Sequence, residues 1–118
     1  MTENVEKNSN IIIDYDDFAK LNIKIGKILS VEEIPKSNKL LKITVNVGED
    51  EERIIVAGIK ESYSSDDLVG TQIVVLTNLR PRKVFGIKSN GMLLAASLDG
   101  KAILLRPDKE VIEGSKIK

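Results

Sequence analysis

The stretch that decides the fold is residues 78–96, NLRPRKVFGIKSNGMLLAA. No acidic residue lies in it, and its basic residues are Arg80, Arg82, Lys83 and Lys88. Just upstream lies the apolar run IVVL at residues 73–76, and the stretch itself ends in the apolar run MLLAA. Each run has the length of a short buried strand. The pattern predicts a basic loop held between two core strands, which suits a polyanion, although charge alone equally fits a solvated loop.

Length and composition narrow the functional classes. The chain has 118 residues, enough for one domain with its own core. It contains neither Cys nor His. This removes disulfides, thiolate metal sites, the commonest zinc ligand and the commonest general base. Carboxylates or Lys could still serve an enzyme, but no catalytic motif is recognisable, so we expect no enzymatic activity, no cofactor and no metal.

Charge is balanced overall but segregated along the chain. Eighteen basic residues match 18 acidic ones, so bulk charge does not attract nucleic acid. Residues 49–52 read EDEE, whereas residues 80–88 are basic. No apolar run approaches the length of a membrane span, and the first ten residues, MTENVEKNSN, lack the features of a signal peptide. We expect a soluble cytoplasmic protein without membrane contacts.

Short extended segments dominate the pattern along the chain. We expect strands at residues 22–31, 41–47, 53–57, 73–76 and 92–97, and a further one at 102–105 after the turn Asp99-Gly100. Gly26 marks a bulge or sharp bend in the first strand. Short helical turns are expected after Asp14, as N-cap, and within residues 59–69. The end, residues 106–118, is expected to wrap the surface.

Five strands with a small helical element between the third and fourth predict an all-β fold, a five-stranded OB-fold barrel with short helical elements and extra terminal strands. The pattern alone leaves an SH3-like barrel or a small sandwich open. Residues 1–13 are predicted to form an N-terminal tail, and residues 14–118 the domain. The apolar triplet at residues 11–13 is expected to pack on the barrel or on a second copy of the chain.

A specific motif lies within the decisive stretch. Asn78-Leu79-Arg80-Pro81-Arg82-Lys83 fits N-L-x-P-R-K, and Gly86-Ile87-Lys88-Ser89-Asn90-Gly91-Met92 fits G-[VI]-x-S-x-G-M. The chain thereby resembles, from about residue 17 onward, the tRNA-binding domain appended to many methionyl-tRNA synthetases. That domain also occurs as a separate β subunit and in stand-alone tRNA-binding proteins. The resemblance favours the OB-fold and implies a non-catalytic, homodimeric module that captures folded tRNA electrostatically, alone or with methionyl-tRNA synthetase or another synthetase.

The resemblance also implies which residues contact tRNA. Arg82 and Lys83 are the strongest candidates, since Arg forks onto phosphate and Lys supplies a point charge. For Asn78, capping of the turn before Pro81 is an equal alternative, and for Met92 the alternative is core packing. The full expected set is Lys39, Asn78, Arg80, Arg82, Lys83, Lys88, Ser89 and Met92.

Five further residues are weaker candidates for RNA contacts: Lys24, Lys27, Lys42, Arg53 and Phe85. The lysines equally suit solvated strand positions, and Arg53 follows an acidic run with which it could form an ion pair. Phe85 stands where a basic residue is frequent in relatives, and an exposed ring there could stack on a base. Ile34 likewise replaces a frequent His, and Lys88 and Asn90 stand where Glu and Gln are common.

A second function stays open. A secretion-chaperone family shares the fold and a similar P-R-[RK]-x-x-G loop, so the alternative is an export-chaperone-like protein that binds unfolded polypeptide. Those relatives typically lack the Ser-x-Gly-Met ending present here, which favours tRNA. By resemblance, the flanking apolar residues would build a two-fold dimer interface, or else pack within one chain: residues 11–13, residues 103–105, Val111 and Ile112.

Overall fold

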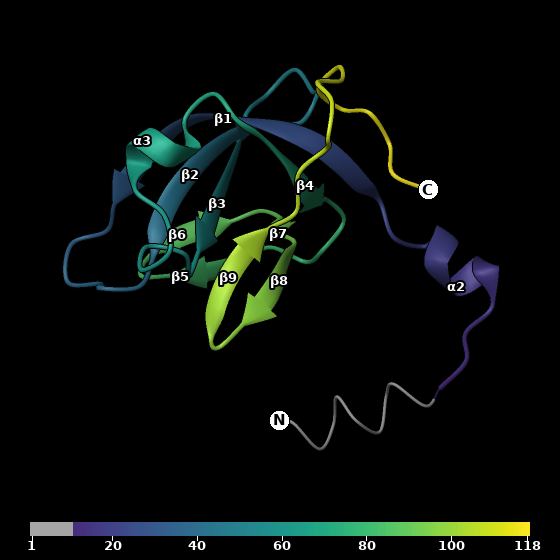
Figure 1. Cartoon of the computed structure of the whole chain (residues 1–118), viewed down its shortest axis with the longest axis horizontal. Coiled ribbons are helices and arrows are strands. Elements are labelled where there is room, and N and C mark those ends of the chain that lie inside the picture. The colour runs from purple at the N-terminus through teal and green to yellow at the C-terminus, as the bar shows by residue number, and fades with distance from the viewer. Residues whose placement is uncertain (1–10) are drawn as a thin grey trace.

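The computed structural model describes residues 11–118, which form a nearly closed barrel of antiparallel strands (Figure 1). The main sheet has the strand order β3-β2-β1-β4-β7. Its strands are β1 (Ile23–Glu33), β2 (Leu41–Asn46), β3 (Arg53–Ala57), β4 (Gln72–Leu76) and β7 (Met92–Leu93). This architecture confirms the predicted all-β, OB-like barrel.

β1 is shared by both halves of the barrel. Its first residues, 23–27, pair with β4, and residues 27–33 pair with β2. The register shifts between Ile28 and Ser30, so the bulge lies there and not at the predicted Gly26. A Cβ at Gly26 would lie 2.6 Å from Val45 Cγ1. Gly26 is therefore required for close packing of β1 on β2.

Two short helices complete the described part, as predicted. Asp14 is the N-cap of α2 (Tyr15–Ala19), and Ser64 is the N-cap of α3 (Ser65–Leu68). In α3, the Ser64 hydroxyl accepts a hydrogen bond from the Asp67 N–H. The Asp67 carboxylate in turn accepts from the Ser64 N–H, and this hydrogen bond is the main cause that lowers the pKa of Asp67. α3 buries Leu68 completely in the core.

Apolar clusters cover both faces of β4. Ile73 and Val75 belong to the main core, while Val74 and Leu76 pack with the start of β1 and with Phe18, Leu94 and Ile117. A strand buried on both faces has no alternation, which explains the unbroken apolar run. The C-terminal segment lies along β1, as expected, with hydrogen bonds such as that from Ile117 N–H to the Ile23 carbonyl (2.9 Å).

The basic stretch differs from its prediction. It is not a loop, because β5 (Arg82–Val84) and β6 (Ile87–Ser89) pair as a hairpin. The predicted strand at residues 92–97 is also divided: β7 pairs with β4, whereas β8 (Ala95–Leu98) pairs with β9 (Lys101–Leu104) in a second hairpin (Figure 1). An unbroken apolar run has no hydrophobic periodicity. It therefore does not show where pairing with β4 ends and pairing with β9 begins.

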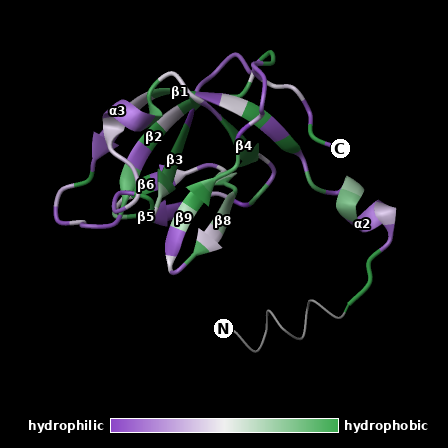
Figure 2. Ribbon diagram, viewed as in Figure 1, coloured by the Kyte–Doolittle hydropathy of each residue, from purple (hydrophilic) through white to green (hydrophobic). Residues whose placement is uncertain are grey.

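Residues 11–13 and α2 lie to one side of the barrel (Figure 1). Ile12 is 94% exposed, and Ile11 and Ile13 are also exposed, so the triplet does not pack on the barrel. It forms an apolar segment next to the polar start of α2 (Figure 2). Across residues 11–118, no helix is both long and apolar enough to cross a membrane. The rest of the predicted tail, residues 1–10, lies outside the described residues.

Candidate nucleic-acid interface

The basic hairpin is closed by a two-residue turn at Phe85 and Gly86. Both residues have positive φ, 52° and 77°, the backbone of a type I′ turn. This turn matches the twist of the flanking strands, so the hairpin is short and regular. Phe85 stands at the tip, 60% exposed. A ring in that place is accessible to a base, as the weaker prediction required.

The hairpin has two chemically different faces. Arg82 pairs with Ser89, and Lys83 pairs with Lys88. Since neighbouring side chains of a strand point to opposite faces, Arg82 and Lys83 do not share a face. Lys83 and Lys88 are like charges directly opposite each other, which destabilises a hairpin unless an anion lies between them. The outer face therefore favours a bound phosphate.

The other face borders a hollow of about 170 Å³. It lies between β3 and the basic stretch, and its lining residues are Val56, Leu79, Arg80, Arg82, Ser89, Gly91 and Met92. Six of these seven belong to the basic stretch, residues 78–96. The hollow thus brings together four of the predicted contact residues, Arg80, Arg82, Ser89 and Met92.

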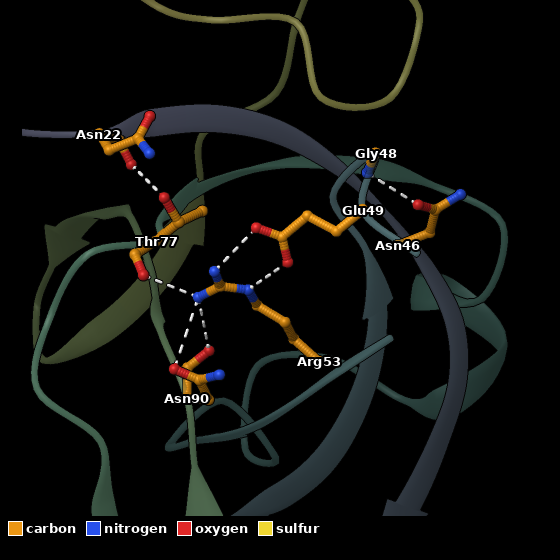
Figure 3. A network of polar contacts seen from close by, with 7 residues as sticks. All are labelled: Asn22, Asn46, Gly48, Glu49, Arg53, Thr77 and Asn90. Carbon is orange, nitrogen blue, oxygen red and sulfur yellow. Dashed lines mark hydrogen bonds and ion pairs between the residues drawn. The ribbon is translucent and has the colours of Figure 1, made fainter. Parts of the chain in front are cut away.

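Arg53 joins the two segments that flank the hairpin, at Thr77 and Asn90 (Figure 3). Its Nη1 donates to the Thr77 carbonyl at 2.7 Å and lies 3.5 Å from the Asn90 carbonyl. Its other nitrogens, Nε and Nη2, donate to the two carboxylate oxygens of Glu49, each at 2.9 Å. The hydrogen bond from Arg53 lowers the pKa of Glu49, with smaller help from the charges of Arg53 and Lys24. The ion pair expected as the alternative role of Arg53 is therefore present.

Two further hydrogen bonds fix the end of the stretch to β3. The Ser89 hydroxyl oxygen accepts from the Val56 N–H at 2.9 Å, and the Asn90 N–H donates to the Ile54 carbonyl at 2.8 Å. Ser89 is buried. Its own hydroxyl proton is not used by this bond and can be donated to a ligand.

Asn78 fastens the beginning of the stretch. Its Nδ2 donates to the Lys20 carbonyl at 2.7 Å, and its Oδ1 accepts from the Asn22 N–H at 2.9 Å. The amide thus holds the connection between α2 and β1. It does not cap the turn before Pro81, and its contact with RNA stays a prediction.

The other predicted lysines are dispersed. Lys42 is the cross-strand neighbour of Val56, next to the hollow, and its ammonium lies 3.4 Å from Glu32. Lys39 is exposed in the connection between β1 and β2. Lys24 and Lys27 are half-buried on β1. Of these four, the strand register brings only Lys42 beside the hollow.

Three residues of the site have roles that sequence reasoning missed. Val56 and Leu79 line the hollow, and Thr77 accepts from Arg53. Leu79 lies within the motif at residues 78–83, but an apolar residue next to a basic loop carries no sign of a binding role. Val56 and Thr77 belong to the site only because segments that are distant in the sequence come into contact there.

The comparison with known families now decides the relationship. Residues 23–116 match the family model described as "Putative tRNA binding domain". The chain belongs to this tRNA-binding domain family. The matched span runs from β1 to the C-terminal segment and includes the hairpin and the hollow.

Relatives of this tRNA-binding domain include synthetases, a synthetase-related protein and chaperones. The methionine–tRNA ligase of Methanosarcina mazei is 50% identical over 118 residues, which is 98% of the chain but only 16% of that enzyme. Among solved structures, a methionyl-tRNA-synthetase-related protein from Pyrococcus horikoshii is 35% identical, with a TM-score of 0.85 over 92% of the chain and 99% of its own. The chaperone CsaA from Bacillus anthracis is 31% identical, with a TM-score of 0.83 over 92% and 100%.

In the tRNA-binding domain, the hairpin lies in the connection between β4 and β7, and the hollow lies between this connection and the outward face of β3. OB-folds bind oligonucleotides on this strand face and its flanking loops. Throughout residues 11–118, the four basic residues of the stretch form no ion pair: Arg80, Arg82, Lys83 and Lys88. Their charge is therefore available to an anionic ligand.

Proposed function

We propose that the chain captures folded tRNA electrostatically, with the β5–β6 hairpin as the main contact. One observation carries the proposal: Arg82, Lys83 and Lys88 project without acidic partners from a hairpin that Arg80 precedes. Hydrogen bonds of Arg53, Ser89 and Asn78 fix the segments on either side of this hairpin. A rigid support lowers the entropy lost when the side chains engage phosphates. Only four aromatic side chains are present in the whole chain, which suits recognition of structured RNA better than general stacking on single strands.

The same relationship suggests a place for the chain in protein synthesis. The chain spans about a sixth of the length of the methionine–tRNA ligases that it matches. We propose that it acts with a methionyl-tRNA synthetase, as a separate β subunit or as a stand-alone tRNA-binding protein. Its role there is to raise the local concentration of tRNA in the cytoplasm, and it does not itself aminoacylate.

Homodimerisation is part of the proposal. The triplet at residues 11–13 is uncovered in one chain, and so are Leu98, Ile103 and Ile112. Residues 11–13 are three consecutive exposed apolar residues, and uncovered apolar surface of this kind in a small domain suits an interface. A second copy that covers these residues would present two basic hairpins to one tRNA.

Binding of unfolded polypeptide is the second candidate function. It is favoured by the likeness to CsaA, which extends over the full length of that chaperone. The two functions differ in the kind of ligand that the hairpin requires. A folded polyanion uses Arg82 and Lys83 directly, whereas an unfolded polypeptide depends mainly on apolar surface.

The test is binding of folded tRNA across a salt series. If about five phosphates are engaged, the logarithm of affinity falls with the logarithm of salt concentration with a slope of roughly −4. The Arg82→Ala/Lys83→Ala variant is expected to flatten this slope by about 2. Lys109→Ala/Lys118→Ala is the matched control, because it removes the same charge from exposed sites on the C-terminal segment.

Unfolded polypeptide serves as the competitor in this experiment. We expect it to leave tRNA binding unchanged. If tRNA does not bind saturably at low salt while the polypeptide binds firmly, the tRNA proposal fails and the chaperone function replaces it. If the control variant flattens the slope as much as the hairpin variant, the hairpin is not the RNA site.

A further inference from the structure

We propose that the hollow beside the hairpin binds a single unstacked nucleobase of the RNA, with a neighbouring phosphate held by Arg80 and Arg82. This inference rests on the proposed tRNA binding and adds a base-binding subsite to what would otherwise be recognition of backbone charge. The side chains at the hollow supply each of the contacts that such a nucleotide needs.

The size and walls of the hollow suit a flat ring. Its volume of about 170 Å³ is roughly ten times the minimum that one water molecule requires. Val56, Leu79 and Met92 give it apolar walls. Met92 is 43% exposed, and its flexible thioether can adapt to the face of a base. An unstacked base that enters the hollow therefore meets apolar side chains.

The polar groups suit the rest of a nucleotide. Arg80 and Arg82 line the hollow, and no acidic residue does, so nothing within it neutralises the two guanidinium groups. Arg binds phosphate through two parallel hydrogen bonds and also stacks on rings. The Ser89 oxygen is fixed by the Val56 N–H, which leaves its proton for a base edge or a 2′-hydroxyl.

The shape of the hollow exists before a ligand binds. Gly91 has φ of +125°, and a Cβ there would lie 3.3 Å from both Ile55 Cδ1 and the Leu76 carbonyl oxygen. Its backbone can therefore follow the wall only as glycine. Ser89 on the same wall is buried and fixed. A preformed site does not lose entropy by ordering itself around the base.

An apolar peptide side chain is the competing occupant, and the charges argue against it. It would fill the apolar part of the hollow but offer no partner to Arg80, Arg82 or the Ser89 hydroxyl proton. Polar groups that lose water without gaining a partner cost free energy. A nucleotide satisfies both the apolar and the charged groups, so we assign the hollow to RNA.

The experiment follows the methyl groups of Val56, Leu79 and Met92 by NMR in the full chain. Four nucleoside 5′-monophosphates are titrated, with ribose 5-phosphate and inorganic phosphate as matched ligands without a base. We expect at least one nucleotide to give saturable ring-current shifts of these methyl signals, because a base lies against them. The two ligands without a base are expected to perturb only the signals of Arg80 and Arg82.

Equal shifts with nucleotide and ribose 5-phosphate would overturn the proposal, as would no methyl shift with any nucleotide. A leucine-containing peptide that shifts the same methyl signals when nucleotides do not would assign the hollow to polypeptide instead. This outcome is independent of tRNA binding, which the salt series measures by itself. Failure of the subsite alone is therefore distinguishable from failure of the proposed function.

A pair of variants completes the test. Met92→Ala is expected to abolish the methyl shifts and weaken tRNA binding about fivefold with an unchanged salt slope, because it removes no charge. Lys83→Ala lies on the outer face and is expected to reduce the slope by about 1 while the nucleotide shifts persist. If Met92→Ala changes neither measurement, the base does not lie in the hollow.

Discussion

The β5–β6 and β8–β9 hairpins have turns of the same conformation but carry different side chains. Each is closed by a two-residue turn with positive φ at both positions: 52° and 77° at Phe85-Gly86, and 52° and 79° at Asp99-Gly100. The first hairpin carries Arg82, Lys83 and Lys88. The second carries Ala96, Leu98, Ile103 and one basic residue, Lys101, on its outer face, with Leu98 61% exposed.

The two hairpins are also attached to the barrel by different contacts, one charged and one neutral. The ion-paired guanidinium of Arg53 joins the segments that flank β5–β6. A single neutral hydrogen bond, from Leu104 N–H to the Tyr63 hydroxyl at 3.0 Å, joins β9 to the segment before α3. The same kind of hairpin thus presents two different surfaces. We propose that β5–β6 binds RNA and that β8–β9 binds a second copy of the chain.

The largest expected effects come from reversing each surface. Leu98→Glu/Ile103→Glu is expected to raise the dimer dissociation constant at least a hundredfold, because it sets like charges against one another across the interface. Lys83→Glu/Lys88→Glu is expected to leave the dimer intact and to abolish tRNA binding at physiological salt. Analytical ultracentrifugation and tRNA titration of both variants measure the four outcomes.

The crossed design makes the assignment of surfaces testable. If the apolar variant stays as dimeric as the wild type, the β8–β9 hairpin is not the interface. If the acidic variant dissociates the dimer, the two surfaces are not separate.

The contacts of Arg53 and Tyr63 are expected to contribute unequally to the free energy of unfolding. Arg53→Gln removes the partner of Glu49 and the donor to Thr77, which should lower the free energy of unfolding by about 2 kcal/mol. Tyr63→Phe removes one neutral hydrogen bond and should cost about 1 kcal/mol. Urea denaturation gives both values.

Measurements of tRNA affinity then show whether Arg53 or Tyr63 positions the RNA-binding hairpin. Arg53→Gln should weaken tRNA binding with an unchanged salt slope, because Arg53 positions the hairpin without contacting phosphate. Arg53→Lys, which keeps the charge but loses the two-pronged geometry, should recover only part of the affinity. A lower salt slope in Arg53→Gln would mean instead that Arg53 contacts RNA directly. Tyr63→Phe should leave the affinity of one chain for tRNA unchanged.

The turn glycines provide a matched pair of smaller perturbations. Gly86 and Gly100 have nearly equal φ, and a Cβ at either would meet no atom within 4 Å. Alanine at either site should therefore cost about 1 kcal/mol of stability through backbone strain alone. Gly86→Ala should weaken tRNA binding, and Gly100→Ala should weaken dimerisation. Unequal stability losses in thermal unfolding would show that the two turns differ in more than their sequence.

Sequence patterns were sufficient for the barrel, and for the position of the basic stretch but not for its hairpin. Alternation in residues 41–47 marks β2, and the motif from Asn78 to Met92 gathers on one side of the barrel. The hairpin inside that motif was missed because its turn is Phe-Gly, whereas a type I′ turn is usually marked by Asn-Gly or Asp-Gly. Asp99-Gly100 carries the usual signal and was found.

The long-range contacts that hold the site in place could not be predicted from the sequence, for a different reason. Arg53 was placed among the RNA contacts as well as in an ion pair, because a charge pattern does not say which distant carbonyl a guanidinium meets. Its bond to Thr77 spans 24 residues, and the bond between Val56 and Ser89 spans 33. Such contacts depend on how β3 closes against the end of the basic stretch, and no local periodicity encodes that closure.

The smallest expected effect concerns the two turn residues that precede the glycines. Phe85 has φ of +52°, a conformation that Asn adopts more readily than an aromatic residue. Phe85→Asn should therefore raise stability by about 0.5 kcal/mol, whereas Asp99→Asn, at the same φ, should change it little. If the Phe85 ring stacks on a base, the more stable Phe85→Asn variant should nevertheless bind tRNA several-fold more weakly. Thermal unfolding and tRNA titration of both variants test this opposition, and unchanged affinity in Phe85→Asn would remove Phe85 from the RNA contacts.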